Sequence, residues 1–285
     1  MIVKQPMSLV DIHSHLVPGV DDGAKHVAGV VASVERMEQA GIRRIVTTPH
    51  IRGSITHEPE RAETRLATVT DAYETARDAL ASSVPEVEYL RGHEVLVDIP
   101  EPDFSDPRIR MAGTSFVLVE WPRLSLPPAT SRVLRWIRDQ GYRPIVAHPE
   151  RYHGVADRIP LLQEWREAGA YLQVNYGSFV GRYGAEPQRA AFRILELGLA
   201  DYLASDFHGQ SGLKLYKREA WDVLTERDGA ELLTTLCRTN PTRLIDDLEP
   251  VPVVPLAPAS KLLDRIRAVV RRGDRSVRGS SGGSS

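Results

Sequence analysis

Short runs of apolar and β-branched residues alternate along the chain with segments whose apolar residues recur at helical spacing. This alternation predicts parallel strands joined by crossover helices, which leaves a barrel or a doubly wound sheet. No Gly-x-Gly-x-x-Gly sequence follows the first run, so a dinucleotide-binding sheet has little support. The expected strands are residues 9–13, 42–48, 87–95, 116–121, 144–148, 171–175 and 201–205. The expected helices are residues 27–37, 60–80, 131–140, 159–168, 188–197 and 214–227.

Composition is typical of a soluble globular chain. Of the 285 residues, 42% are hydrophobic and 26% are charged, which allows a substantial core. The formal net charge of -2 argues against bulk affinity for nucleic acid. The single cysteine, Cys237, cannot form a disulfide within the chain, and no apolar stretch is long enough to span a bilayer. We therefore expect a cytoplasmic protein.

Proline content and charge change near residue 250. Four prolines within residues 249–260 predict an extended connector and exclude a regular helix. Residues 251–285 carry seven basic and two acidic side chains, and they end in a Gly/Ser tract typical of disorder. We expect a barrel domain over 1–249, a Pro-rich linker over 250–260, and a basic amphipathic segment with a disordered tail over 261–285. Residues 261–272 are expected either to contact an anionic membrane surface or to form a solvated helix.

Imidazoles and carboxylates stand at the carboxyl ends of nearly all the expected strands. Two pairs are spaced two residues apart, so the members of each pair point to the same side of an extended chain. Taken alone, each residue would be a hydrogen-bonded core side chain or a helix cap. Together, at the mouth of a parallel barrel, they would repel one another or remain unpaired unless metal ions neutralised them, so we infer a multinuclear metal site. These residues are His13, His15, His50, Glu94, Glu120, His148, Asp206 and His208.

Several ordered motifs make the chain resemble the polymerase-and-histidinol-phosphatase (PHP) superfamily, and more narrowly its bacterial protein tyrosine phosphatases. The similarity runs from about residue 8 to residue 248 and implies a distorted seven-stranded parallel β/α barrel, similar to a TIM barrel, that binds three metal ions. The motifs are Asp-Ile-His-Ser-His at 11–15, Val-Asp-Asp-Gly at 20–23, Thr-Pro-His at 48–50, His-Pro-Glu-Arg-Tyr at 148–152, Ser-Asp-Phe-His at 205–208 and Thr-Asn-Pro-Thr-Arg-Leu at 239–244.

The resemblance also implies a ligand set. Glu94 would bridge two ions, and of the adjacent Asp21 and Asp22 the motif position selects Asp22. Nitrogen and oxygen donors without thiolate suit manganese, iron or zinc, and manganese is the expected metal. The first ion would be held by His13, His15, Glu94 and Asp206, the second by Glu94, Glu120 and His148, and the third by Asp22, His50 and His208.

Phosphate binding is expected from two basic residues. Arg151 matches the family motif and is expected to hold phosphate, although an ion pair with Glu150 or Asp157 is the alternative. Lys214 stands near the position where relatives place an arginine, and it offers a point charge without the arginine fork. The residues that follow His50 also depart from the family pattern, because Ile51 and Arg52 replace a second histidine.

The function that the resemblance implies is metal-dependent hydrolysis of phosphotyrosine, with a bacterial tyrosine kinase that controls capsule or exopolysaccharide synthesis as the expected partner. Three alternatives stay open. The chain could hydrolyse histidinol phosphate or another phosphoester, it could be an amidohydrolase, or it could be a kinase-binding module without catalysis.

A second phosphatase signature needs a separate explanation. Cys237 and Arg243 have the Cys-x5-Arg spacing of cysteine-dependent tyrosine phosphatases. Their nucleophile requires a tight loop whose backbone amides surround phosphate. Here Cys237 follows a helical run, the intervening residues include no glycine, and Pro241 removes one amide donor. We interpret the spacing as coincidence.

Overall fold

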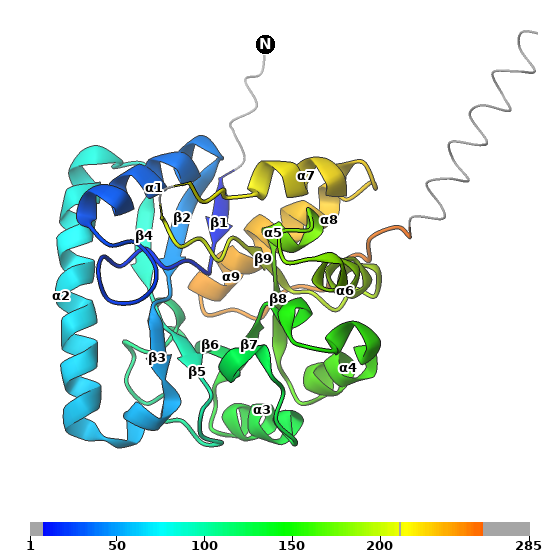
Figure 1. The fold of residues 1–285 in the computed structure, drawn as a ribbon, viewed down its shortest axis with the longest axis horizontal. Coiled ribbons are helices and arrows are strands. Elements are labelled where there is room, and N and C mark those ends of the chain that lie inside the picture. The colour runs from blue at the N-terminus through cyan, green and yellow to red at the C-terminus, as the bar shows by residue number, and fades with distance from the viewer. Residues whose placement is uncertain (1–7, 211, 259–285) are drawn as a thin grey trace, which may run out of the picture.

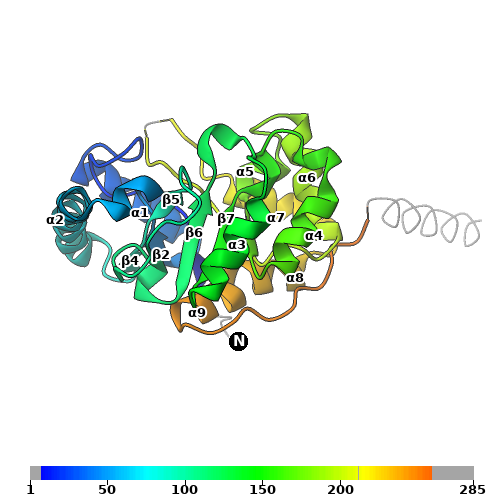
Figure 2. The same cartoon turned by 90° about the horizontal axis from the view of Figure 1, so that it is seen from below.

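The computed structural model describes residues 8–210 and 212–258 (Figure 1). Within these residues the fold is α/β, with parallel strands in two sheets of order β1-β2-β4 and β3-β5-β6-β7-β8-β9. The helices surround the strands, and the long α2 lies along one edge (Figures 1 and 2). The strands are β1 (Leu9–Asp11), β2 (Ile42–Thr47), β3 (His50–Arg52), β4 (Glu88–Arg91), β5 (Glu94–Leu96), β6 (Phe116–Glu120), β7 (Arg143–Ala147), β8 (Tyr171–Asn175) and β9 (Tyr202–Ala204).

The predicted helices are present with shifted ends, and three short ones accompany them. α5 and α9 were not expected, whereas α8 corresponds to the helical run predicted before Cys237, and a π-helical turn over Thr235–Thr239 joins α8 to α9. The helices are α1 (Val27–Gln39), α2 (Pro59–Ser83), α3 (Thr130–Asp139), α4 (Ile159–Glu167), α5 (Tyr176–Phe179), α6 (Ala185–Glu196), α7 (Lys217–Thr225), α8 (Ala230–Thr234) and α9 (Asn240–Ile245).

The expectation of seven strands in one barrel is not confirmed, because one expected strand is divided and an unexpected short strand, β3, follows another. The expected strand 42–48 stops before Pro49, which has no amide hydrogen to donate, and the chain resumes as β3. The expected strand 87–95 divides at Gly92, where a Cβ would lie 2.9 Å from the Cα of Met111. β2 and β4 therefore pair in one sheet, whereas β3 and β5 pair in the other.

Backbone hydrogen bonds nevertheless join the first strand to the last. The amide of His15 donates to the carbonyl of Phe207 at 2.9 Å, and the amide of Asp206 donates to that of His13 at the same distance. Asp11 strengthens this junction, because its buried carboxylate accepts from the amides of His13 (3.1 Å) and Ser205 (3.0 Å). The carboxyl ends of β1 and β9, where two of the motifs lie, are thus held side by side.

The core explains why most strands read as continuous apolar runs. Residues of β6, such as Val117, Leu118 and Val119, are fully buried on both faces of the strand, as expected for a parallel sheet covered by helices. α1 turns Val30, Val34 and Met37 inward at helical spacing. Large aromatic residues fill the interior on the opposite side, where Trp121 stacks on Trp165 with ring centroids 5.4 Å apart.

The Pro-rich stretch after residue 249 forms no helix up to residue 258, and it packs on the domain. Asn240 exchanges two hydrogen bonds with the backbone of Val251, and the amide of Leu256 donates to the carbonyl of Leu195 at 3.0 Å. The predicted amphipathic segment 261–272 and the Gly/Ser tail lie outside the described residues. Among the helices that are described, none combines the length and the apolar character needed to cross a membrane.

Candidate metal centre and active site

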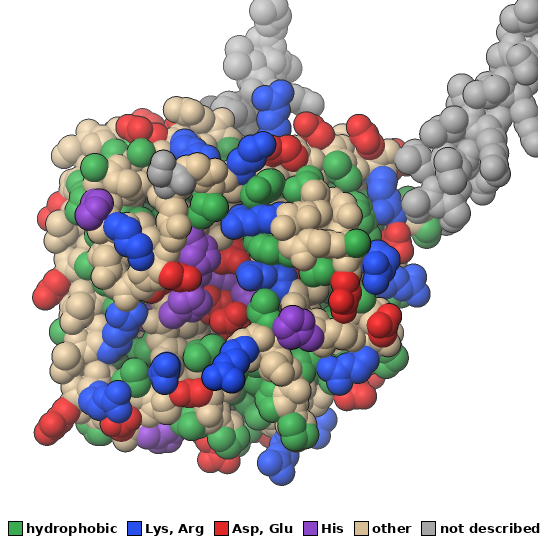
Figure 3. Space-filling view, in the orientation of Figure 1, with side chains coloured by type: hydrophobic (Ala, Val, Ile, Leu, Met, Phe, Trp, Pro, Cys, Tyr) green, Lys and Arg blue, Asp and Glu red, His purple; other side chains and the backbone are tan. Residues whose placement is uncertain are grey.

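The structure brings all nine candidate metal ligands together. Seven of them end or follow β1, β6, β7 and β9, whereas His50 and Glu94 begin β3 and β5, just after the carboxyl ends of β2 and β4. In Figure 3, purple histidine and red carboxylate side chains gather in a hollow near the centre of the face shown. A cavity of about 440 Å³ next to them is lined by residues that include His50 and Glu120. The nine residues are His13, His15 and Asp22 after β1, His50 in β3, Glu94 in β5, Glu120 at the end of β6, His148 after β7, and Asp206 and His208 after β9.

Glu94 is the centre of this cluster. Its Oε2 lies 3.2 Å from the Nε2 of His13, 3.4 Å from the Nε2 of His15 and 3.1 Å from the Nδ1 of His50. Its other oxygen, Oε1, lies 3.2 Å from the Nε2 of His148. Only 1% of Glu94 is exposed. A buried carboxylate that faces four imidazoles has the geometry to bridge ions bound on its two sides.

Three overlapping groups of side chains have ligand atoms close enough to share an ion. They match the expected ligand sets in part. The group around Asp22 contains all three ligands expected for the third ion and also His15. The group around His13 lacks Asp206, which was expected at the first ion. The group around Glu120 contains His50 where His148 was expected at the second ion. Asp206 and His148 are close by, since the Oδ1 of Asp206 lies 3.6 Å from the Nε2 of His13 and the Nε2 of His148 lies 3.7 Å from the Oε1 of Glu120. The groups are His15, Asp22, His50 and His208; His13, His15 and Glu94; and His50, Glu94 and Glu120.

The electrostatics of the cluster favour bound cations. Burial alone would raise the pKa of Glu94, but the charge of His13 and hydrogen bonds with the facing imidazoles hold it well below its usual range. Burial also opposes protonation of His15, yet hydrogen bonds to Asp21 and Glu94 raise the pKa of this imidazole to about 10. The negative charge of the carboxylates therefore stabilises positive charge within the buried cluster. Divalent ions can supply the same charge without protons.

Two hydrogen bonds orient the first pair of histidines. The Nδ1 of His15 lies 2.8 Å from Oδ2 of Asp21, and the Nδ1 of His13 lies 2.8 Å from Oε1 of Gln173. Acceptors at Nδ1 hold a proton there, so Nε2 carries the free lone pair whenever the imidazole is neutral, as a metal ligand must be. The two Nε2 atoms face each other at 3.3 Å. Sequence reasoning missed Gln173 entirely and considered Asp21 only as a ligand. The sequence could have indicated the orienting role of Asp21, because this residue is a hydrogen-bond acceptor next to a proposed ligand in the Val-Asp-Asp-Gly motif. Gln173 belongs to no motif, so the sequence contained no such indication.

Arg151 borders the cluster, and its ion pair differs from the alternative expected from the sequence. Its partner is neither Glu150 nor Asp157, because Nη1 donates to Oδ2 of Asp206 at 2.6 Å. The same oxygen accepts from Asn175 at 2.9 Å. The guanidinium also lies over the ring of Tyr183, 4.4 Å from its centroid. Arg151 is therefore held at the edge of the cluster by a charge and by an aromatic face.

The local backbone accommodates this convergence at a conformational cost. His148 and Asp206 both have positive φ, +32° and +50°, which is uncommon outside glycine and concentrates at functional sites. Gly23 allows the loop that carries Asp22 to touch the segment that follows β1, because a Cβ at this position would lie 2.0 Å from the carbonyl oxygen of His15. Any other residue here would push the loop away from the cluster.

The remaining candidates lie apart from the cluster. Lys214 is exposed between β9 and α7, and no hydrogen bond or ion pair connects it to the other described site residues. Cys237 is fully buried in the π-helical turn, and burial raises the pKa of its thiol to about 12. A buried, protonated thiol within a helical segment offers no loop for phosphate, which agrees with the interpretation of the Cys-x5-Arg spacing as coincidence. His93, next to Glu94, faces away and lies 3.0 Å through Nδ1 from the carbonyl of Arg108.

Comparisons with known proteins agree with this geometry. A family model described as capsular polysaccharide synthesis, CpsB/CapC, matches residues 9–246. The tyrosine-protein phosphatase CpsB of Streptococcus pneumoniae is 30% identical over 248 residues, which cover 84% of this chain and 99% of that protein. The tyrosine-protein phosphatase YwqE of Bacillus subtilis is 28% identical over 227 residues, which cover 79% of this chain and 87% of that protein.

A solved structure agrees as well. It comes from crystal structures of YwqE and CpsB, described as unique metal-dependent tyrosine phosphatases. It matches with a TM-score of 0.73 and 25% identity, over 87% of this chain and 99% of its own. The resemblance drawn from the motifs is thus confirmed, and this chain belongs to the CpsB/CapC family of capsular polysaccharide synthesis proteins.

Proposed function

We propose that this protein is a metal-dependent phosphatase that hydrolyses phosphotyrosine in proteins. The observation that carries the proposal is the cluster centred on Glu94, where buried imidazoles and carboxylates converge beside the guanidinium of Arg151. Relatives that cover most of this chain are named tyrosine-protein phosphatases, which supports the same substrate class. A tyrosine-phosphorylated protein, and specifically a bacterial tyrosine kinase in capsule or exopolysaccharide synthesis, is the partner we propose.

The donor set fits three divalent ions. We propose the ligand sets that the family resemblance implies. His15 also lies beside the ligands proposed for the third ion. Imidazole nitrogens and carboxylate oxygens without thiolate suit manganese, iron or zinc, and we propose manganese among them. Bound ions would activate a water for attack on phosphorus and neutralise charge on the phosphoryl oxygens. The hydrogen bonds that His15 and His13 donate to Asp21 and Gln173 prepare the two imidazoles for this role by fixing which nitrogen is free.

Arg151 is proposed to hold the phosphoryl group. Its planar fork can donate two parallel hydrogen bonds to phosphate oxygens, and its present partner, Asp206, is itself a proposed ligand. Tyr183 lies against the guanidinium and limits its movement. Lys214 is proposed only as an outer contact that steers phosphate, because it is exposed and the described structure gives it no bond to the cluster. The tyrosine leaving group needs little acid assistance, since its phenol has a pKa of about 10.

The architecture that supports this chemistry is proposed to be one distorted barrel. If β2 with β3 and β4 with β5 are counted as single segments, seven segments follow one another, and the backbone bonds of His15 with Phe207 and of Asp206 with His13 close the ring. We propose residues 1–249 as the phosphatase domain and 250–260 as a linker. Residues 261–285 remain proposed as an amphipathic segment and tail, with membrane contact through 261–272.

A comparison of substrates tests the proposed function. Purified protein with manganese should hydrolyse a tyrosine-phosphorylated peptide with a higher kcat/KM than histidinol phosphate. The reverse preference would favour the alkyl phosphatase alternative. Inactivity towards both substrates in protein that carries its metals would contradict the proposal.

A further inference from the structure

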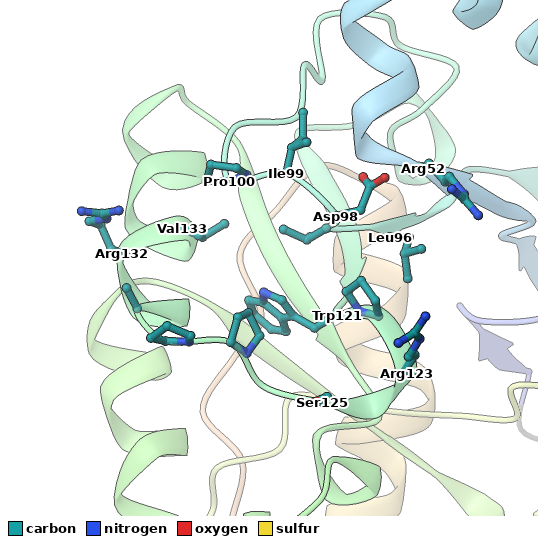
Figure 4. Close-up of a pocket in the computed structure, with 15 residues that line it drawn as sticks. Arg52, Leu96, Asp98, Ile99, Pro100, Trp121, Arg123, Ser125, Arg132 and Val133 are labelled. Atoms are coloured by element: carbon teal, nitrogen blue, oxygen red, sulfur yellow. The ribbon is translucent and has the colours of Figure 1, made fainter.

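A second, larger cavity lies beside the active site. Its volume is about 780 Å³, and it shares Arg52 and Leu96 with the cavity that contains His50 and Glu120. Its walls come from the segment after β5, the loop after β6 and the start of α3 (Figure 4). A substrate whose phosphate reaches the metal ligands would therefore extend over this surface.

The floor of this cavity is apolar and its rim is cationic. Leu96, Trp121 and Val133 line the interior. Three arginines stand around it, with Arg52 and Arg123 at one end and Arg132 at the other (Figure 4). Such a surface can bury the carbon chains of a peptide and bind its charged groups at the edge.

The three arginines have no competing partners within the described structure. Arg52, Arg123 and Arg132 are exposed, and none of them forms a side-chain hydrogen bond or ion pair with a described residue. Asp98, the one acidic residue among the described residues that line the cavity, forms no ion pair with these arginines. Its carboxylate accepts hydrogen bonds from the amide (2.8 Å) and the hydroxyl (2.6 Å) of Ser54. The cavity thus presents unbalanced positive charge, although the chain as a whole has a net charge of -2.

The loop that carries Arg123 is held in its shape before any ligand binds. Pro122, Pro127 and Pro128 restrict its backbone, and Arg123 and Ala129 adopt positive φ values of +58° and +64°. Its position is further fixed by the carbonyl of Leu124, which accepts from the amide of His153 at 3.1 Å. A preformed wall reduces the ordering cost of binding.

We infer that this cavity binds the acidic segment that flanks the phosphotyrosine of a protein substrate. The inference rests on the proposed phosphotyrosine phosphatase function and adds a substrate preference to it. Glutamate or aspartate side chains beside the phosphotyrosine would meet Arg123 and Arg132, while apolar side chains of the same segment would cover Leu96 and Trp121. Lysine-rich flanking sequences would be repelled.

The test compares phosphotyrosyl peptides that differ only in their flanking charge. Three peptides of one length carry glutamate, glutamine or lysine on both sides of the phosphotyrosine, and free phosphotyrosine serves as the fourth substrate. The enzymes are the wild type, the double variant Arg123→Gln/Arg132→Gln and the control variant Arg135→Gln. Arg135 is an exposed arginine of α3 that does not line the cavity.

The wild type should prefer the glutamate peptide over the glutamine peptide, and the double variant should lose about three- to tenfold in kcat/KM for the glutamate peptide alone. The preference should shrink between about 0.1 M and about 1 M salt, because the screening length falls from about 10 Å to about 3 Å. Activity on free phosphotyrosine should stay unchanged in both variants. Equal hydrolysis of the three peptides, or an acidic preference that survives in the double variant, would overturn the inference while leaving the proposed function intact. Failure to hydrolyse every phosphotyrosyl substrate, free phosphotyrosine included, would overturn both.

Discussion

Substitution of Asp21 by asparagine separates an orienting role from a ligand role. The side chain of Asp21 accepts from Nδ1 of His15 at 2.8 Å, from the amide of Gly23 at 2.9 Å and from the amide of His50 at 3.2 Å. Asparagine keeps one acceptor oxygen, which can continue to serve Gly23. Its amide group replaces the oxygen that faces His15 and His50, so those two donors lose their partner.

The expected cost falls on metal affinity. Without the acceptor, the His15 imidazole can carry its proton on Nε2, the atom that faces His13 and Glu94. Loss of such an outer hydrogen bond weakens metal binding by about 10- to 100-fold, which is about 1.4 to 2.7 kcal/mol. Because the proposed ligands remain, saturating metal should restore most of the activity.

Chelator-buffered manganese titrations of phosphotyrosyl-peptide hydrolysis measure this shift. Asp71→Asn is the control, since Asp71 is exposed on α2 and its side chain forms no bond with the other described site residues. Asp22→Asn is the contrasting variant, because Oδ1 of Asp22 lies 3.5 Å from Nε2 of both His50 and His208. It should lower the number of bound ions, and added manganese should not restore its activity. A manganese requirement in Asp21→Asn within twofold of the wild type would refute the orienting role of Asp21. If added manganese restored the activity of Asp22→Asn but not that of Asp21→Asn, Asp21 would be the ligand and Asp22 the orienting residue.

Three further predictions concern residues around the cluster. Cys237→Ser should retain nearly full activity, whereas complete loss in a folded protein would revive the cysteine mechanism. Arg151→Lys should raise KM for a phosphotyrosyl peptide about tenfold with unchanged metal content, because lysine lacks the bidentate fork, and an unchanged KM would remove Arg151 from phosphate binding. Burial raises the pKa of Glu150 from 4.5 to about 7, so the charged form destabilises the fold as pH rises through that value. Between pH 4.5 and pH 8, the free energy of unfolding of the wild type should therefore fall by up to about 3 kcal/mol relative to that of Glu150→Gln, as measured by thermal unfolding. An identical pH dependence of the two proteins would contradict the raised pKa of Glu150.

The helices and the order of the strands could be predicted because their signals are local. Apolar residues at helical spacing predicted a helix over residues 27–37, and Val30, Val34 and Met37 of α1 are buried. The division of the expected strand 87–95 could not be predicted as reliably, because Gly92 is required by the close approach of Met111, a contact between segments that are separated in the sequence. The apolar run over residues 87–95 therefore predicted one strand, whereas the fold contains two, β4 and β5.

The gathering of the candidate ligands followed from a topological rule, whereas their orientation did not. Parallel strands bring their carboxyl ends to one mouth, so residues as far apart as His13 and Asp206 were expected to meet. The partner of Nδ1 of His13 is Gln173, which lies 160 residues away and belongs to no motif. Arg151 likewise was assigned neighbours close in sequence, but its ion pair is with Asp206, 55 residues away. Contacts of this kind depend on the folded arrangement and leave no periodic signal.

Metal removal and replacement most directly tests the claim that phosphotyrosine is hydrolysed at the cluster centred on Glu94. Hydrolysis of a tyrosine-phosphorylated peptide and metal content would be measured in the purified protein, after chelation and after addition of manganese, with Glu94→Gln as the comparison. In the wild type, activity should disappear with chelation and return with manganese, and Glu94→Gln should stay folded but inactive. Activity that is indifferent to chelation, or an active and metal-loaded Glu94→Gln variant, would contradict it.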